Sequence, residues 1–375
     1  MKWKIPLYKI FTDRDDNKAV NKVLQRGMDW AIGHEIAEFE KKIANYIGTK
    51  YCVAFNSGTS AGHAALLAIN INSGEVIVPS FTFISTANWP LMVNAKPKFV
   101  DIEEENFGLS PERVKVEITK NTKAIIPIHY GGRPCKIIEI NRIARNKKIT
   151  LIEDCAEALG AKIKGVSVGT FGQMSIFSFA PNKILTTGEG GAICTDSRKI
   201  FEKLQLIRSH GRKVNENYFK TSQLSDYISI GYNWRMSSIT AALGLSQFDK
   251  LDRIIQLRRQ HARFYVSKLK KIKEIKLLDE PKDHLHVYQL FTIQLKNNLI
   301  RNELQKFLTS RGIMTKVFFE PIHLSNFYKK SGFGKKSLPN TEKISQTVLS
   351  LPIFPGLKSE EIRYICDSTQ EFFQN

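Results

Sequence analysis

Short apolar runs alternate with helical stretches along the chain from about residue 51. The apolar runs expected as strands are Tyr51–Phe55, Glu75–Val78, Pro97–Val100, Ala124–Ile128, Ile149–Ile152, Ser175–Phe179 and Gly191–Cys194. Helical patterns such as Ser60–Ile69 and Cys135–Asn146 lie between them. Strands that alternate with helices predict an α/β fold with a mainly parallel sheet, covered by helices on both faces.

The pattern changes near residue 240, where a long helical stretch runs from Ser237 to Leu269 and is expected to bend near Asp249. The runs that follow predict strands at Val287–Leu295 and Ile313–Phe319 and helices at Arg301–Arg311, Thr341–Leu349 and Ser359–Phe373. We therefore expect a large domain over residues 1–248 and a smaller α+β domain over residues 249–375.

Composition narrows the class of protein. The chain has 375 residues, of which 42% are apolar, so a sizeable core is expected. No run of eighteen apolar residues and no signal-peptide pattern is present, so neither a membrane helix nor export is expected. The five cysteines are widely spaced without a CxxC pair, which argues against a disulfide framework or a zinc site and favours a reducing cytoplasm.

The 56 basic and 36 acidic residues give a net charge of +20. Such a charge suits either nucleic-acid binding or the attraction of small anionic substrates. The basic residues are dispersed, and no zinc-finger, basic-zipper or RNP pattern appears. We therefore expect an anionic small-molecule substrate and no nucleic-acid partner.

Lys183 is the most informative residue, because it lies in a turn of small residues after a strand. About thirty residues upstream, the strand Ile149–Ile152 ends in Glu153 and Asp154. A lysine amine can form an imine with pyridoxal phosphate, and a carboxylate can keep the pyridine nitrogen of that cofactor protonated. On its own, Asp154 could equally cap a helix or bind a metal ion.

The segment Asn56–Ala61 predicts a site for the cofactor phosphate. It follows a strand and opens an Ala-rich helix, where unpaired N–H groups and the helix dipole favour an anion. Gly58 lets the backbone approach the ligand, and the hydroxyls of Thr59 and Ser60 add donors. The same residues would also serve as an ordinary helix N-cap.

Two more residues join this candidate site. Ser178 lies five residues before Lys183 and could donate to the same phosphate, or bond to the backbone of its strand. Glu157 lies one helical turn after Asp154, or it is a solvated helix residue. The glycine-rich run Thr186–Gly191 precedes a strand rather than following one, which argues against a dinucleotide-binding fingerprint.

Five motifs, in a fixed order along the chain, indicate a resemblance to a known family. They are Asn56–Ser60, Pro79–Phe83, Glu153–Glu157, the Lys183 segment and Gly231–Met236, and the resemblance covers nearly the whole chain. In this order they resemble the DegT/DnrJ/EryC1/StrS family of pyridoxal-phosphate sugar aminotransferases. The resemblance implies an aspartate-aminotransferase-like fold (PLP fold type I), with a seven-stranded, mostly parallel sheet and a smaller C-terminal domain.

The resemblance also implies roles for single residues. Lys183 holds the cofactor covalently, Asp154 pairs with its ring nitrogen, Thr59, Ser60 and Ser178 bind its phosphate, and Glu157 lies near its 3-hydroxyl. Phe83 matches the aromatic residue that stacks on the ring, and Asn233 matches an asparagine that reaches the phosphate in the neighbouring subunit. A homodimer with shared sites is therefore expected, with no metal ion. Phe83 could instead be a simple packing residue.

The C-terminal runs Val317–His323 and Leu351–Pro355 are similar to those of the sugar 4-aminotransferases of this family. His323, Lys316 and Tyr328 are the candidate sugar or diphosphate contacts, although His323 could be an ordinary loop histidine. The expected reaction moves an amino group from L-glutamate to a nucleotide-linked 4-keto-6-deoxy sugar such as GDP-4-keto-6-deoxymannose. A UDP-linked 4-keto-amino sugar, a 3-keto sugar, other pyridoxal chemistry and a non-catalytic regulatory or binding protein stay open as alternatives.

Overall fold

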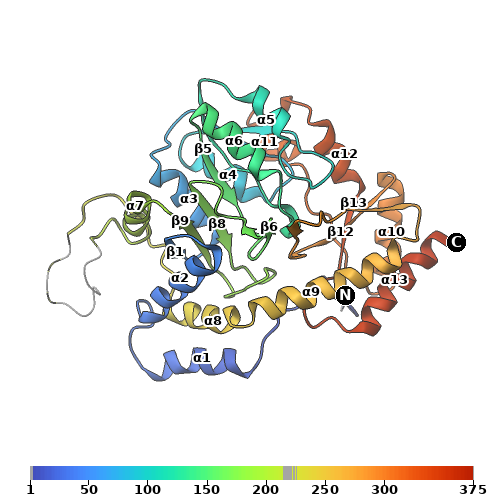
Figure 1. Cartoon of the computed structure of the whole chain (residues 1–375), viewed down its shortest axis with the longest axis horizontal. Coiled ribbons are helices and arrows are strands. Elements are labelled where there is room, and N and C mark those ends of the chain that lie inside the picture. The colour runs from blue at the N-terminus through green and yellow to red at the C-terminus, as the bar shows by residue number, and fades with distance from the viewer. Residues whose placement is uncertain (1–2, 214–221, 223, 225, 375) are drawn as a thin grey trace.

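All seven apolar runs expected as strands form one sheet in the computed structural model, which describes residues 3–213, 222, 224 and 226–374 (Figure 1). The sheet order is β1-β9-β8-β5-β4-β2-β3. Only β9 runs antiparallel to its neighbours, β1 and β8, and the other pairs are parallel. The bounds are β1 Tyr51–Phe55, β2 Glu75–Pro79, β3 Lys96–Val100, β4 Thr122–Ile125, β5 Thr150–Asp154, β8 Met174–Ser178 and β9 Gly191–Thr195. The expected α/β fold is confirmed.

Helices cover both faces of this sheet because successive strand side chains point in opposite directions. Val53 and Ile152 pack with residues of α3, α4 and α7 on one face. Cys52 packs against α2, and Leu151 against α6, on the other. The helices are α1 Arg14–Gln25, α2 His34–Ile47, α3 Gly58–Ala68, α4 Ile84–Met92, α5 Pro111–Glu117, α6 Ile137–Lys147 and α7 Arg198–Arg208.

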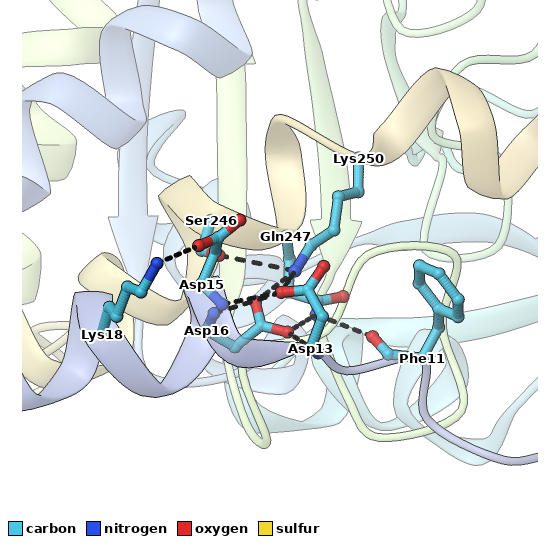
Figure 2. A network of polar contacts seen from close by, with 8 residues as sticks. All are labelled: Phe11, Asp13, Asp15, Asp16, Lys18, Ser246, Gln247 and Lys250. Atoms are coloured by element: carbon cyan, nitrogen blue, oxygen red, sulfur yellow. Dashed lines mark hydrogen bonds and ion pairs between the residues drawn. The ribbon is translucent and has the colours of Figure 1, made fainter.

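The long helical stretch is two helices, α8 (Ser238–Phe248) and α9 (Leu251–Leu269), so the bend expected near Asp249 is confirmed. Figure 1 shows α9 running from α8 toward the C-terminal helix α13 (Ser359–Gln374). Lys250 lies at the break between α8 and α9. Its Nζ lies 2.8 Å from Asp13 Oδ1 and 2.7 Å from Asp16 Oδ1, which ties α1 to the break (Figure 2).

The same network anchors the N-terminal segment that precedes α1. Gln247 Nε2 donates to Phe11 O at 2.9 Å and to Asp16 Oδ2 at 3.0 Å. Burial raises the pKa of Asp16, but hydrogen bonds from Lys250, the Asp13 amide, Ser246 and Gln247 outweigh it and hold the pKa below its usual range. Asp16 therefore stabilises the fold in its charged form.

Lys250→Met is expected to lower the free energy of unfolding by about 2 kcal/mol, because it removes a charged hydrogen bond to the buried Asp16. A carboxyl whose pKa is lowered by folding contributes stability above its unfolded pKa of about 3.9, and loses it as the pH falls through the folded pKa. The difference between wild type and variant in urea unfolding should thus be largest near pH 7 and shrink below about pH 4.

The matched control for that variant is Lys18→Met. Lys18 pairs with Asp15 in the same helix at 3.2 Å (Figure 2). Both side chains are largely exposed, Lys18 by 76% and Asp15 by 73%. Exposed pairs contribute little, so the control should unfold like the wild type. Equal effects of the two substitutions would contradict the role given to Lys250.

The C-terminal part contains a second, antiparallel sheet of β10 (Ile275–Leu277), β12 (Phe291–Leu295) and β13 (Val348–Leu351), with β12 in the middle. Its helices are α10 Asn298–Ser310, α11 Asn326–Lys330, α12 Pro339–Thr347 and α13, with short 3-10 turns at Ile322–Leu324 and Phe333–Lys335. A third small sheet joins β6 (Lys162–Ile163) to β7 (Val166–Ser167) and to β11 (His284–Leu285), and so links the two parts of the chain.

Three C-terminal predictions were wrong in part. The strand expected at Val287–Leu295 begins only at Phe291. The run Ile313–Phe319 is not a strand: it makes single bridges at Ile313 with Ile5 and at Lys316 with Ser350. Its aromatic residues pack instead against a cluster around Phe81. The expected helix Thr341–Leu349 ends at Thr347, because the fully buried residues Val348–Leu351 pair with β12 as β13.

The expected boundary between residues 248 and 249 falls at the break between α8 and α9 and stays a prediction. Ile5, from the N-terminal end, packs in the same cluster as the buried residues of β12, β13 and α13. In the described part of the chain, no helix has the length and apolar content needed to cross a membrane.

Candidate active site

Lys183 lies on a tightly tied loop between β8 and β9. The Lys183 amide donates to Ala180 O at 3.0 Å, and the Phe179 amide donates to Gly190 O at 2.9 Å, which closes the base of the loop. Gln289, from the segment before β12, donates through Nε2 to Asn182 O at 2.5 Å. The lysine side chain is 14% exposed. The loop backbone is therefore tied in place, and the lysine side chain that it carries is largely buried.

Asp154 ends β5 at the carboxyl edge of the sheet, where open α/β sheets bind ligands. Its Oδ2 accepts from Thr86 Oγ1 at 2.8 Å and its Oδ1 from the Ala156 amide at 3.1 Å. The side chain is buried, and burial raises its pKa, while the charge of Lys183 acts to lower it. The two groups are thus close enough to interact.

Glu157 completes this group. Its Oε1 lies 3.6 Å from Lys183 Nζ, and its Oε2 accepts from the Gly131 amide at 2.8 Å. Gly131 belongs to the 3-10 turn Tyr130–Gly132, which follows β4. The structure therefore brings Lys183, Asp154 and Glu157 together, and the solvated-helix interpretation of Glu157 does not hold.

The first turn of α3 lies beside Ser178. A Cβ built on Gly58 would lie 3.0 Å from Ser178 Cβ and 3.2 Å from its Oγ, so only a glycine fits there without a shift. Thr59 Oγ1 lies 2.9 Å from Ser85 Oγ, and Ser60 Oγ lies 2.6 Å from Asn56 Oδ1. The structure thus gathers the residues expected to bind the phosphate, with the hydroxyl of Ser60 committed to Asn56.

Phe83 lies at the N-cap of α4 and leaves 58% of its surface exposed. Its carbonyl accepts from the Thr86 amide at 3.2 Å, one turn before the hydroxyl that bonds Asp154. It lines a cavity of about 300 Å³ together with Phe319 and Leu324. The ring of Phe83 is therefore not buried as a core packing residue, and its place on the cofactor ring stays a prediction.

Other candidates lie away from Lys183. His323 is fully buried, with Nδ1 2.7 Å from Ser80 Oγ and Nε2 3.4 Å from Glu342 Oε1. Tyr328 is also fully buried and donates to Asn88 Oδ1 at 2.7 Å. The structure therefore does not bring these two residues to the site, because their polar atoms already bond within the chain.

Lys316 and Asn233 are exposed. Lys316 Nζ lies 5.3 Å from the centre of the Phe318 ring, at the edge of a cavity of about 530 Å³. The backbone of Asn233 bridges to Ser209, and no contact with Lys183 is shown for it in the described part of the chain. A role for Asn233 across a subunit boundary stays a prediction.

Sequence reasoning missed a buried support behind Asp154. Glu153 accepts from the amides of Gly169 at 2.8 Å, Phe171 at 2.7 Å and Gly172 at 2.8 Å, and lies 3.2 Å from His129 Nε2. The His129 amide donates to Asp154 O at 3.2 Å. An acid next to Asp154 was the only signal for this role.

Ligand atoms of His129, Glu153 and Cys155 lie within 4.8 Å of one another, a spacing that could hold a metal ion. Both oxygens of Glu153, however, already accept backbone hydrogen bonds. We therefore interpret this group as a hydrogen-bonded support for the strand that carries Asp154. Thr86, Gly131 and Gln289 were missed as well, because long-range partners leave no local pattern.

The site fits pyridoxal phosphate on two observations. Among the described residues, no cation lies within ion-pair distance of the buried Asp154 carboxylate, and an unpaired buried charge is costly, so a cationic ring would suit it. The N-terminal end of α3 lies against Ser178, where the helix dipole favours an anion, and the Ser60 amide there donates to Ser57 Oγ at 3.1 Å. The residues present therefore match the ring and the phosphate of the cofactor.

Comparison with known proteins decides the family. The model of the DegT/DnrJ/EryC1/StrS aminotransferase family matches residues 11–370. The chain belongs to this family. GDP-perosamine synthase of Escherichia coli O157:H7 is 35% identical over 372 residues, which cover 99% of each chain. A protein of Geobacillus stearothermophilus named pleiotropic regulatory protein is 36% identical over 358 residues, or 94% of this chain and 93% of that one.

The structure resembles that of Spr1654 from Streptococcus pneumoniae, which has been solved in a PLP form and a PMP form. In the PLP form the TM-score is 0.92 and the sequence identity 25%, with 99% of this chain and 98% of that chain covered. The PMP form gives the same values. The expected fold and the expected cofactor, pyridoxal phosphate, are thus confirmed for this DegT/DnrJ/EryC1/StrS family member.

Gly58→Ala is expected to raise the dissociation constant for pyridoxal phosphate about tenfold, because the added methyl group pushes Ser178 and the α3 amides out of position for charged hydrogen bonds. Spectroscopic titration of the apoprotein with the cofactor measures this constant. Gly356→Ala is the control, since a Cβ there meets no atom within 4 Å. An unchanged constant for Gly58→Ala would remove α3 from the phosphate site.

Proposed function

We propose that this protein transfers an amino group from L-glutamate to a nucleotide-linked keto-sugar. The observation that supports this most directly is the Lys183 amine, held 3.6 Å from Glu157 beside the buried carboxylate of Asp154. The family supplies the reaction class. The full-length similarity to GDP-perosamine synthase favours a GDP-linked 4-keto-6-deoxy sugar such as GDP-4-keto-6-deoxymannose as the acceptor.

Pyridoxal phosphate, when bound, supplies an electron sink that stabilises negative charge on the carbon bearing the amine. Asp154 would keep the proton on the ring nitrogen, and the first turn of α3 with Ser178 would hold the phosphate. Phe83 would cover one face of the ring. Each of these residues positions the cofactor and does not itself exchange atoms with the substrate.

Lys183 would carry the covalent attachment and then act as the general base and acid. Its amine would remove the proton from Cα of glutamate in the first half of the reaction. In the second half it would return a proton to the sugar carbon that receives the nitrogen. Glu157 lies close enough to orient the amine, and the loop closed by Phe179 and Gly190 keeps it within reach.

A homodimer that shares its active sites belongs to the proposal. Met28, Trp30 and Ile230 are large apolar side chains with 62%, 46% and 86% of their surface exposed, and a second copy of the chain would cover them. Asn233, exposed in one chain, would then reach the partner's cofactor phosphate. Light scattering should give twice the mass of one chain. A monomer with full activity would contradict the proposed homodimer.

The surface charge supports an anionic substrate, and the cysteines support a location in the cytoplasm. A net charge of +20 would draw in a nucleotide diphosphate by long-range attraction. The five cysteines are unpaired in the structure, which fits a proposed location in the reducing cytoplasm.

The test is an incubation of the purified protein with pyridoxal phosphate, L-glutamate and a panel of GDP- and UDP-linked 4-keto and 3-keto sugars. Mass spectrometry reads the product, and NMR reads the carbon that carries the amine. We expect amination at C4 of the GDP-linked sugar. Amination of a UDP-linked sugar or at C3 would replace the proposed acceptor by one of the alternatives.

A regulatory role is the second candidate, favoured by the 36% identity to the pleiotropic regulatory protein. In that case the cofactor would bind, but no amino donor would change its absorbance. Such a result, together with no product from any sugar, would overturn the enzyme proposal.

A further inference from the structure

The largest cavity of those described, about 780 Å³, lies away from Lys183. One wall comes from the large-domain side: the segment Glu104–Asn106, the start of α6 and β6. The other wall comes from β10 and the segment that follows it, in the C-terminal part. Neither Lys183, Asp154 nor the first turn of α3 lines it, so it is separate from the proposed active site.

Arg133 lines this cavity and is 5% exposed. One terminal nitrogen, Nη1, donates to Glu105 O at 3.0 Å, but Nε is buried and bonds to no atom of the described chain. No carboxylate in that part of the protein lies within ion-pair distance of the guanidinium. A buried cation in this state is costly, which indicates that a partner is missing.

The N-terminus of α6 opens on the same cavity. Lys136 is the N-cap, and its side chain makes no capping hydrogen bond to the helix. Ile137 and Ile138, the first residues of this 11-residue helix, line the cavity. The first turn of a helix presents unpaired N–H groups with partial positive charge, so it adds to the guanidinium.

The acids around the cavity are mostly paired with other groups. Lys136 Nζ lies 2.7 Å from Glu103 and 2.6 Å from Glu105. Glu104 pairs with Lys343, and Asp283 with His284. Burial lowers the pKa of Arg133, and Glu280 and Asp279 act in the opposite direction without reaching ion-pair distance. Among the described residues, Arg133 therefore feels acids at longer range but forms no ion pair.

We propose that this cavity binds a small molecule through a carboxylate or phosphate group, which lies between Arg133 and the first turn of α6. Arg133 lines the cavity with a planar guanidinium, which suits an oxyanion, while Nε itself is covered by neighbouring protein atoms. Ile138, Leu277 and Leu278 provide apolar surface for the rest of the ligand. Because the walls come from both parts of the chain, bound ligand joins the large domain to the C-terminal part.

Two anomalous scatterers test the site in crystals of the cofactor-loaded protein. Selenate stands for a phosphate head, and 4-bromobenzoate for a carboxylate with an apolar body. We expect an anomalous peak within hydrogen-bond distance of Arg133 for at least one probe, and the probe that gives it identifies the preferred head group. The absence of a peak at Arg133 with both probes would overturn the proposal.

Calorimetry with the same probes gives the dissociation constant. Arg133→Gln is expected to raise it at least about tenfold, because a charged hydrogen-bonding partner is lost. Arg301→Gln is the matched control: its Nε is also buried without a partner, but it lines the separate cavity of about 530 Å³. Equal dissociation constants for Arg133→Gln and wild type would also overturn the site.

Arg133→Lys keeps the charge and serves if Arg133→Gln does not fold. Lysine lacks the planar fork, so it should bind the probe more weakly than wild type yet keep a normal circular dichroism spectrum. Wild-type affinity in a folded Arg133→Lys protein would contradict recognition by the guanidinium. These measurements do not depend on transamination, so the proposed function and this site can fail separately.

Discussion

Lys183→Ala is expected to lower kcat by at least about 10⁴-fold, because general acid–base catalysis and covalent attachment are lost together. The lysine side chain is 14% exposed and its amine lies 3.6 Å from Glu157, so a base from bulk solvent does not replace it easily. The measurement is steady-state amination of the nucleotide sugar with L-glutamate as donor. Lys41→Ala, which removes an exposed lysine on α2, is the control and should keep wild-type kcat.

The same variant has a second readout that does not depend on turnover. Borohydride reduction should fix the cofactor to the wild-type chain but not to Lys183→Ala, as seen in the intact mass. The α3 N-terminus and Asp154 should still retain the cofactor without the covalent link. A Lys183→Ala protein that keeps turnover, or still becomes covalently labelled, would show that another amine binds the cofactor and acts in catalysis.

Asp154→Asn is expected to lower kcat/KM for L-glutamate by about 10²- to 10⁴-fold. Loss of one partner from a buried charge pair costs about 3–5 kcal/mol, and about 1.4 kcal/mol corresponds to tenfold in rate. The amide keeps the size of the side chain, so the hydrogen-bonded support from Glu153 and His129 to the strand should survive. Stopped-flow absorbance of the glutamate half-reaction measures the change directly.

Asp367→Asn on α13 is the control for Asp154→Asn, because Asp367 is exposed and far along the chain from the site. It should react like the wild type. If Asp154→Asn also left the half-reaction unchanged, the carboxylate would not be the partner of the ring nitrogen.

The central sheet was predictable because its strands are short, buried and apolar, and because helices separate them. Tyr51–Phe55 matches β1 at both ends, and the break near Asp249 was also found. The strand prediction for Ile313–Phe319 failed because the apolar residues Val317–Phe319 pack around Phe81 and do not pair in a sheet. Local periodicity cannot tell which of two apolar runs will pair with β12.

The sequence also predicted some residues of the site and missed others. Lys183, Asp154 and Glu157 were found because chemistry restricts the residue types that can fill those roles. Gln289 was missed, since the residue to which its side chain donates, Asn182, is 107 positions away. His323 and Tyr328 were candidates from a family resemblance, which does not reveal that both side chains are buried and hydrogen-bonded within the chain.

The contact between Gln289 and Asn182 bears on protein engineering. Because a residue of the C-terminal half holds the backbone next to Lys183, chimeras that exchange this half between relatives would also change the loop that carries the lysine. A donor half that keeps glutamine at this position should yield active hybrids more often than one that does not.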